Sequence, residues 1–144
     1  MTHRRVLAVV SAAQLGAGLA GLVVALVRRR AYDLPLLHGS PEHVARDSVL
    51  MGTAYSAPVP MLVAQVGSTV RLVRVGDRRA VRDLTTLGAL MVPGYLAERY
   101  GRAVLRRWDP VETPVVLAGT GLAAAMVVLG VRDLSAEKRG TRRS

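Results

Sequence analysis

The sequence of 144 residues has no cysteine and no phenylalanine, and it contains a single tryptophan. Without cysteine the chain has neither disulfide bonds nor thiolate metal ligands. The scarcity of aromatic side chains also argues against the basic, aromatic platforms on which single-stranded nucleic acids stack. We therefore expect no nucleic-acid partner, although the formal net charge is +10.

Lysine is almost missing as well, since Lys138 is the only one and the other basic residues are arginines. The charges gather in blocks between long uncharged stretches, and 51% of the chain is apolar. This distribution predicts an all-α integral membrane protein whose arginines lie beside lipid headgroups. A composition rich in arginine, alanine, valine and glycine is typical of GC-rich bacterial genomes, so we expect a bacterial inner (plasma) membrane protein.

Four uncharged segments predict a four-transmembrane-helix bundle with short loops. Residues 6–27, 48–70 and 113–131 are each long enough to cross a hydrocarbon core of about 30 Å. The third span, 80–97, contains an uninterrupted uncharged run of only fourteen residues, 84–97. It could therefore be a short or tilted span, or a re-entrant segment. For the first span the alternative is a signal peptide cleaved before Gly21.

Prolines lie inside two of these segments. Pro58 and Pro60 fall in the second, and Pro93 falls in the third. Proline removes a backbone donor and clashes with the preceding turn, so helices 2 and 3 are predicted to be Pro-kinked, with helix 2 either kinked or broken. Residues 1–132 would form a single transmembrane domain, followed by a polar, basic and frayed C-terminal tail at 133–144.

The arginine distribution predicts an orientation for the bundle. An even number of spans places both termini on one side of the membrane. Twelve basic residues fall on that side and eight on the other. The positive-inside rule therefore predicts that both termini are cytoplasmic.

Small residues recur at every fourth position in the first and last spans. Such spacing lets helix backbones approach closely in lipid, where apolar side chains alone give no net drive to associate. We expect either tight packing between these two helices or a homodimer seam. The helix-packing residues are Ala12, Gly16, Ala20, Gly119 and Ala123.

The loop HGSPEHVARD holds two imidazoles and two carboxylates, at His38, Glu42, His43 and Asp47. One reading is a catalytic site at the membrane surface, with His43 as general base held by Asp47. A metal held by two imidazoles and a carboxylate is a second reading. The third is an ordinary helix start, where acidic residues complement the dipole. The spacing matches no strong metal motif, so we predict no metal and no cofactor.

A second polar cluster precedes the last span. It would form a site for a headgroup or another anionic ligand, or else a solvated interfacial loop. Its candidate binding residues are Arg99, Arg102, Arg106, Arg107 and Trp108.

The uncharged segments 6–27, 48–70, 84–97 and 113–131 contain no ionised side chain, and this bears on function. Proton-coupled pumps usually carry an intramembrane carboxylate or imidazole. We therefore predict a non-catalytic accessory subunit or a self-associating membrane protein, and not an enzyme. Its partners would be the lipid bilayer and another copy or a different membrane protein. The alternative is a membrane-embedded enzyme or carrier for a lipid-like molecule, with a polar mouth at 38–47.

Overall fold

The computed structural model describes the whole chain except residues 1, 29–32, 35–36, 39–51, 54 and 142–144. The described part is mainly helical, and it also contains a two-residue antiparallel pair, β1 (Asp33–Leu34) with β2 (Leu37–His38). This outcome agrees with the all-α prediction. The helices are α1 (Thr2–Val27), α3 (Val59–Arg74), α4 (Arg78–Ala97), α5 (Arg99–Arg106) and α6 (Glu112–Thr141).

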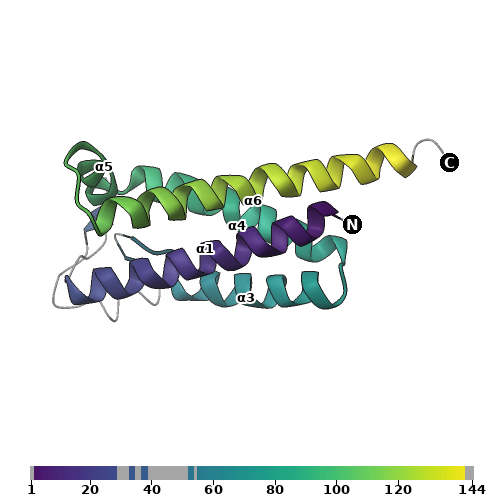
Figure 1. Cartoon of the computed structure of the whole chain (residues 1–144), viewed down its shortest axis with the longest axis horizontal. Helices are drawn as coiled ribbons and strands as arrows, with labels where there is room; N and C mark the ends of the chain where they lie inside the picture. Colours follow the sequence, from purple (N-terminus) through teal and green to yellow (C-terminus); the bar gives the residue numbers. More distant parts are fainter. Residues whose placement is uncertain (1, 29–32, 35–36, 39–51, 54, 142–144) are drawn as a thin grey trace.

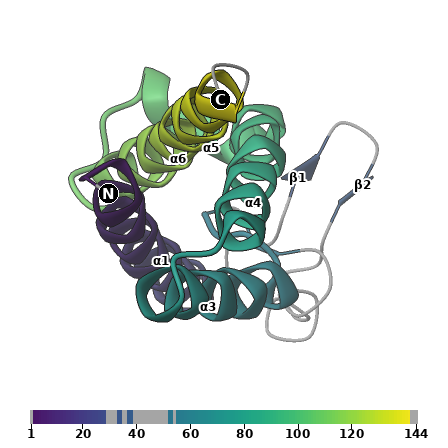
Figure 2. The same ribbon diagram turned by 90° about the vertical axis from the view of Figure 1, so that its right-hand side faces the viewer.

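The four longer helices form an antiparallel bundle. α1 and α4 lie at opposite corners, and each packs against both α3 and α6 (Figures 1 and 2). Figure 1 shows both chain termini and the α3–α4 turn at one end of the bundle. α5 and the turn into α6 lie at the other end. We call these the terminal end and the α5 end.

The second helix starts later than the sequence predicts. Residues 52 and 53 and 55–58 are not helical, and Thr53 forms an isolated bridge with Ser56. Pro58 occupies the N-cap position of α3, and Pro60 lies in its first turn. Proline is tolerated there because the first N–H groups of a helix have no intrahelical partner. The prediction of a helix through 52–58 that is kinked at Pro58 is therefore wrong, because these prolines begin the helix.

The third helix agrees closely with its predicted span. α4 runs from Arg78 to Ala97 and continues through Pro93. Its N-terminus is capped by Asp77, whose Oδ1 accepts a hydrogen bond of 2.7 Å from the N–H of Ala80.

The last helix is longer than predicted. α6 continues to Thr141, so most of the segment expected to be a frayed tail is helical. The side chain of Asp133 in this extension pairs with Arg4 Nε of α1 at 3.0 Å. This contact ties the extension to the terminal end of the bundle.

Two of the described helices are long and apolar enough to cross a membrane. They are His3–Val27 of α1 and Glu112–Ala136 of α6, with mean hydropathies of 2.0 and 2.1. α3 has only 16 residues, and α4 begins with a block of arginines. Length and composition therefore weakly indicate membrane association for two helices, and they do not establish four spans.

Glycines allow α4 and α6 to pack closely. A Cβ added to Gly88 would lie 2.7 Å from the carbonyl oxygen of Ala123, and one on Gly119 would lie 3.0 Å from the ring of Tyr95. Ala123 is fully buried with Met91 and Tyr95. Among the predicted packing residues, Gly119 and Ala123 thus lie in the α4–α6 contact.

The other three predicted packing residues have a different environment. Ala12, Gly16 and Ala20 lie on an exposed face of α1. A Cβ added to Gly16 would meet no atom within 4 Å. This face of α1 is therefore not covered by any of the described residues.

Candidate functional site

The outer surface of the bundle is apolar on all four long helices. Large exposed side chains include Val9 of α1, Val63 of α3, Leu90 of α4 and Leu117 of α6, each more than half exposed. A row of exposed valines continues along α3 at 66, 70 and 73. Water-soluble proteins rarely expose contiguous apolar surface of this kind.

The interior, by contrast, contains several polar side chains. Ser11 and Gln14 of α1 and Gln65 of α3 are fully buried, and Ser68 is nearly so. These polar side chains lie beside clusters of buried hydrophobic residues, so the interior is partly polar while much of the exterior is apolar.

Gln65 connects three helices at the centre of the bundle. Its Nε2 donates to the backbone oxygen of Ser11 at 3.0 Å and lies 3.1 Å from Ser11 Oγ. It also lies 3.6 Å from the sulfur of Met126 on α6. The Ser11 hydroxyl in turn lies 2.7 Å from Thr69 Oγ1. These bonds fix the register of α1 against α3.

Gln14 lies near this network without taking part in it. Both amide atoms of its side chain are buried and have no hydrogen-bond partner, as is also true of Gln65 Oε1 and the Tyr95 hydroxyl. The Tyr95 hydroxyl interacts with the Gln14 side chain across the bundle, but the two groups do not meet the geometry of a hydrogen bond. The bundle therefore contains a set of polar groups whose hydrogen-bonding capacity is only partly used.

At the α5 end, an ion-pair network joins the first and last helices. Arg28 Nη1 lies 3.0 Å from Asp109 Oδ2 and 2.9 Å from Glu112 Oε1. Asp109 Oδ1 also accepts 2.8 Å hydrogen bonds from the N–H groups of Val111 and Glu112. The Glu112 N–H, the Arg28 guanidinium and the Val111 N–H together lower the pKa of Asp109 to about 2. Asp109 is thus a charged cap for α6.

α5 is fixed against this end by its buried side and by the start of α6. Val104 packs with Ala25, Tyr55 and Val116. Its backbone oxygen accepts a hydrogen bond of 3.3 Å from Thr113 Oγ1. The opposite side of α5 is exposed and basic.

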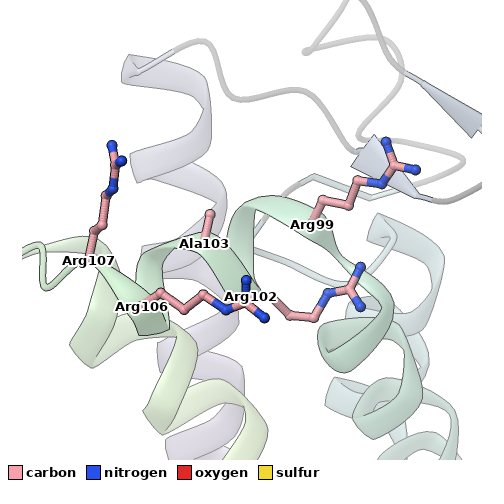
Figure 3. A pocket seen from close by; sticks show the side chains of 5 residues that line it. All are labelled: Arg99, Arg102, Ala103, Arg106 and Arg107. Carbon is pink, nitrogen blue, oxygen red and sulfur yellow. The ribbon is translucent and has the colours of Figure 1, made fainter.

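The exposed side of α5 forms a hollow with a volume of about 650 Å³. Figure 3 shows the four arginine side chains around it, all from α5 and the residue that follows it. We call it the arginine hollow, and its lining residues are Arg99, Arg102, Ala103, Arg106 and Arg107. The structure thus brings four of the five predicted ligand residues together.

Trp108, the fifth predicted ligand residue, does not line the hollow. Its side chain is 72% exposed, one residue beyond Arg107. Among the described residues, the lining consists of four arginines and one alanine, without a carboxylate. Guanidinium groups hold planar forks of donors that fit phosphate and carboxylate oxygens.

A second hollow, of about 790 Å³, lies at the terminal end between α1 and the end of α3. Its lining mixes arginines with exposed valines and Leu72. Arg4 here is engaged by Asp133 and by the backbone oxygen of Gly76. Because Arg4 is already paired and most of the lining is apolar, this hollow is a weaker candidate for binding an anion.

The predicted site at 38–47 falls largely outside the described residues. Glu42, His43 and Asp47 lie there, and the structure places only the backbone of His38, opposite Asp33. In the part of the chain that the structure describes, no group of three or more metal-ligating side chains occurs. The enzyme-or-carrier alternative stays a sequence prediction.

Sequence reasoning missed the contacts between helices at this end and in the centre. Arg28 directly follows the first uncharged segment and Glu112 precedes the last, but the sequence does not predict that they pair. Their position at helix ends is the only signal, and it does not identify a partner. Gln65 lies within the second uncharged segment, but the sequence does not identify Ser11 as its partner.

Comparison with protein-family models, with curated proteins and with solved structures found no match to this chain.

Proposed function

We propose that all four long helices cross a membrane, which makes the chain a multi-pass integral membrane protein. The supporting observation is the apolar surface on α1, α3, α4 and α6 around a partly polar interior. If only α1 and α6 crossed, the exposed valines of α3 would face water. That arrangement would cost roughly 25 cal/mol for each Å² of apolar surface left hydrated.

The lengths of the two shorter helices fit a thin or locally adapted bilayer. The 16 residues of α3 extend over about 24 Å at 1.5 Å per residue. Arginines at 71 and 74 end this helix, and arginines at 78, 79 and 82 begin the next. Long basic side chains near helix ends extend toward headgroups, and the bilayer thins around a short span at modest cost.

The proposed orientation has both termini and the α3–α4 turn in the cytoplasm, and the α5 end outside. The larger number of basic residues on the terminal side supports it. The inner membrane of a bacterium is the corresponding location.

Cysteine labelling tests the number of spans, because the chain has no cysteine of its own. Single cysteines at Val75, Trp108 and Arg139 occupy exposed positions and mark the α3–α4 turn, the α5 end and the C-terminal helix. An impermeant maleimide is applied to spheroplasts and to lysed cells. Four spans predict labelling of the Trp108→Cys protein in spheroplasts and of the other two only after lysis.

Other labelling patterns distinguish the alternatives. Val75→Cys and Trp108→Cys labelled from the same side would mean that α3 and α4 form a hairpin outside the membrane. Labelling of Val75→Cys and Arg139→Cys from outside, with Trp108→Cys protected, would invert the orientation. Recovery of the protein in the soluble fraction would refute the membrane proposal.

For its activity we propose a non-catalytic, self-associating membrane protein, with a second copy packed on the exposed small-residue face of α1. Ala12, Gly16 and Ala20 leave this face open, and Gly16 has free space above it. In lipid such a surface allows close backbone approach and dispersion contacts along the helix. The same face would fit a helix of an accessory partner, which is the other outcome of the test.

The test compares two leucine substitutions of matched chemistry. Gly16→Leu fills the proposed seam, whereas Gly67→Leu adds the same side chain to an exposed position of α3 that also has nothing within 4 Å. Native mass spectrometry in mild detergent measures the number of copies. We expect Gly16→Leu alone to convert dimer to monomer. A wild-type monomer isolated with a different protein would assign the face to that partner, and equal assembly in both variants would refute the seam.

A further inference from the structure

The arginines of α5 share one side of a single helix. Arg99, Arg102 and Arg106 are spaced i, i+3 and i+7, which places them within one stripe. Arg107 follows at the helix end and lines the same hollow (Figure 3). The arrangement follows directly from the sequence RYGRAVLRR.

This arrangement is electrostatically unfavourable as it stands. Like charges three and four residues apart on a helix destabilise it. Within the described residues, Arg102, Arg106 and Arg107 take part in no ion pair or side-chain hydrogen bond. Acidic residues do occur nearby, but Asp109 and Glu112 pair with Arg28, and Glu98 at the start of α5 is buried. In the part of the chain that the structure describes, Arg102, Arg106 and Arg107 therefore have no anionic partner.

We propose that the arginine hollow binds a phosphate group. A phosphate monoester presents three free oxygens, and a diester two, to the guanidinium groups that line the hollow. A carboxylate presents only two oxygens, which lie in one plane with its carbon. The volume of about 650 Å³ lies in the range of small-ligand pockets and leaves room for what the phosphate is attached to. The described residues of the lining include no carboxylate that would repel it.

The surroundings of the hollow point to two sources for the phosphate. Leu105 and Trp108 are both exposed beside it, and an exposed tryptophan next to arginines is typical of the membrane–water interface. If the bundle spans the bilayer as proposed above, a lipid phosphodiester lies at this level. A soluble phosphate compound reaches the same hollow from the aqueous side, and this second source does not depend on the four-span arrangement.

Trp108 provides a built-in reporter, because it is the only tryptophan and lies next to Arg107. The protein is held in maltoside micelles, which contain no phosphate, at constant ionic strength. One series adds inorganic phosphate or pyrophosphate, and the other adds phosphatidylglycerol to the micelles. Trp108 emission and native mass spectra report binding in each series.

The variant and its control remove the same number of charges. Arg102→Gln with Arg106→Gln removes two forks from the hollow. Arg79→Gln with Arg82→Gln removes two exposed arginines of α4 at the other end. Loss of two charge-assisted contacts is expected to weaken binding roughly tenfold or more, and the control pair is expected to weaken it less than about twofold because distant charges are screened. Circular dichroism verifies that both variants keep their helix content.

Each outcome decides a point. Selective loss in the lipid series alone assigns the hollow to a headgroup, and selective loss in the soluble series alone assigns it to a free phosphate compound. Equal weakening by both double variants, or no binding of either probe to the wild type, overturns the proposal. The cysteine-labelling result is independent of these titrations, so a failure of the four-span proposal is recognised separately.

Discussion

Gln14 and Gln65 are both fully buried in the bundle, yet the structure predicts opposite effects for the same substitution. Gln65 holds α1 through the backbone oxygen and hydroxyl of Ser11. Gln14 has two buried amide atoms that make no hydrogen bond. Methionine is close to glutamine in length and removes the amide, so Gln14→Met and Gln65→Met isolate this difference.

The magnitudes follow from the contacts that each residue makes. A buried polar group without a partner costs about 1–3 kcal/mol, so removing the amide of Gln14 is expected to stabilise the protein by about 1 kcal/mol. Hydrogen bonds between membrane helices contribute about 0.6 kcal/mol each on average. Loss of the two bonds from Gln65 therefore costs about 1 kcal/mol, part of which is offset because its Oε1 has no partner either. The two variants should differ by about 1–2 kcal/mol.

The assay is reversible unfolding in mixed micelles, followed by helix content as the mole fraction of dodecyl sulfate rises. Gln14→Met should shift the midpoint upward and Gln65→Met downward from the wild type. A loss of stability in Gln14→Met equal to that in Gln65→Met would refute the reasoning. It would mean that Gln14 has a partner, such as a bound water, that holds it in place.

Two further predictions concern the α4–α6 contact and the cap of α6. Gly88→Ala places a methyl group 2.7 Å from the Ala123 oxygen and should destabilise the bundle by about 1–3 kcal/mol. Gly121→Ala adds the same group in open space and should stabilise the bundle by about 0.5–1 kcal/mol. Similar unfolding midpoints for the two variants would contradict the close contact. Because the pKa of Asp109 is lowered from 3.8 to about 2, its stabilising contribution is complete above the unfolded-state value and is lost as pH falls through about 2. Asp109→Asn should remove this part of the pH dependence of the melting temperature, and parallel melting profiles for variant and wild type between these values would disprove the assignment.

The positions of the helices follow from the sequence wherever charge marks their limits. The predicted span 80–97 lies within α4, and 6–27 lies within α1, because arginine blocks interrupt the uncharged runs near their ends. The predicted start of α3 was wrong because a run of uncharged residues does not distinguish a helix from non-helical backbone. Pro58 sets the start of this helix, since it occupies the N-cap position.

The predicted end of the last helix was wrong for a different reason. The segment after Val131 is polar, and we interpreted this polarity as a frayed tail. Alanine, glutamate, lysine and arginine are, however, good helix formers, and the Arg4–Asp133 pair holds the extension to α1. A contact across 129 positions in the sequence cannot be read from local composition.

The sequence predicts the residues of the arginine hollow but not its shape. The density of arginines near Trp108 identified the region, but the sequence alone did not show that they line one hollow. That follows from α5 lying across the end of the bundle, with Val104 buried beneath it. The small-residue pattern was ambiguous for the same reason, since spacing does not say which helix covers which face.

The length of α6 has a mechanical consequence. Its 30 residues extend over about 45 Å, whereas a hydrocarbon core is about 30 Å thick. The helix continues beyond its neighbours at the terminal end (Figure 1) and carries charged residues on the projecting part. If α6 crosses a bilayer as proposed, a change in its tilt would produce a larger displacement at Thr141 than at the bundle. A fluorescent domain fused there would make a small rotation of the bundle measurable as a sideways displacement.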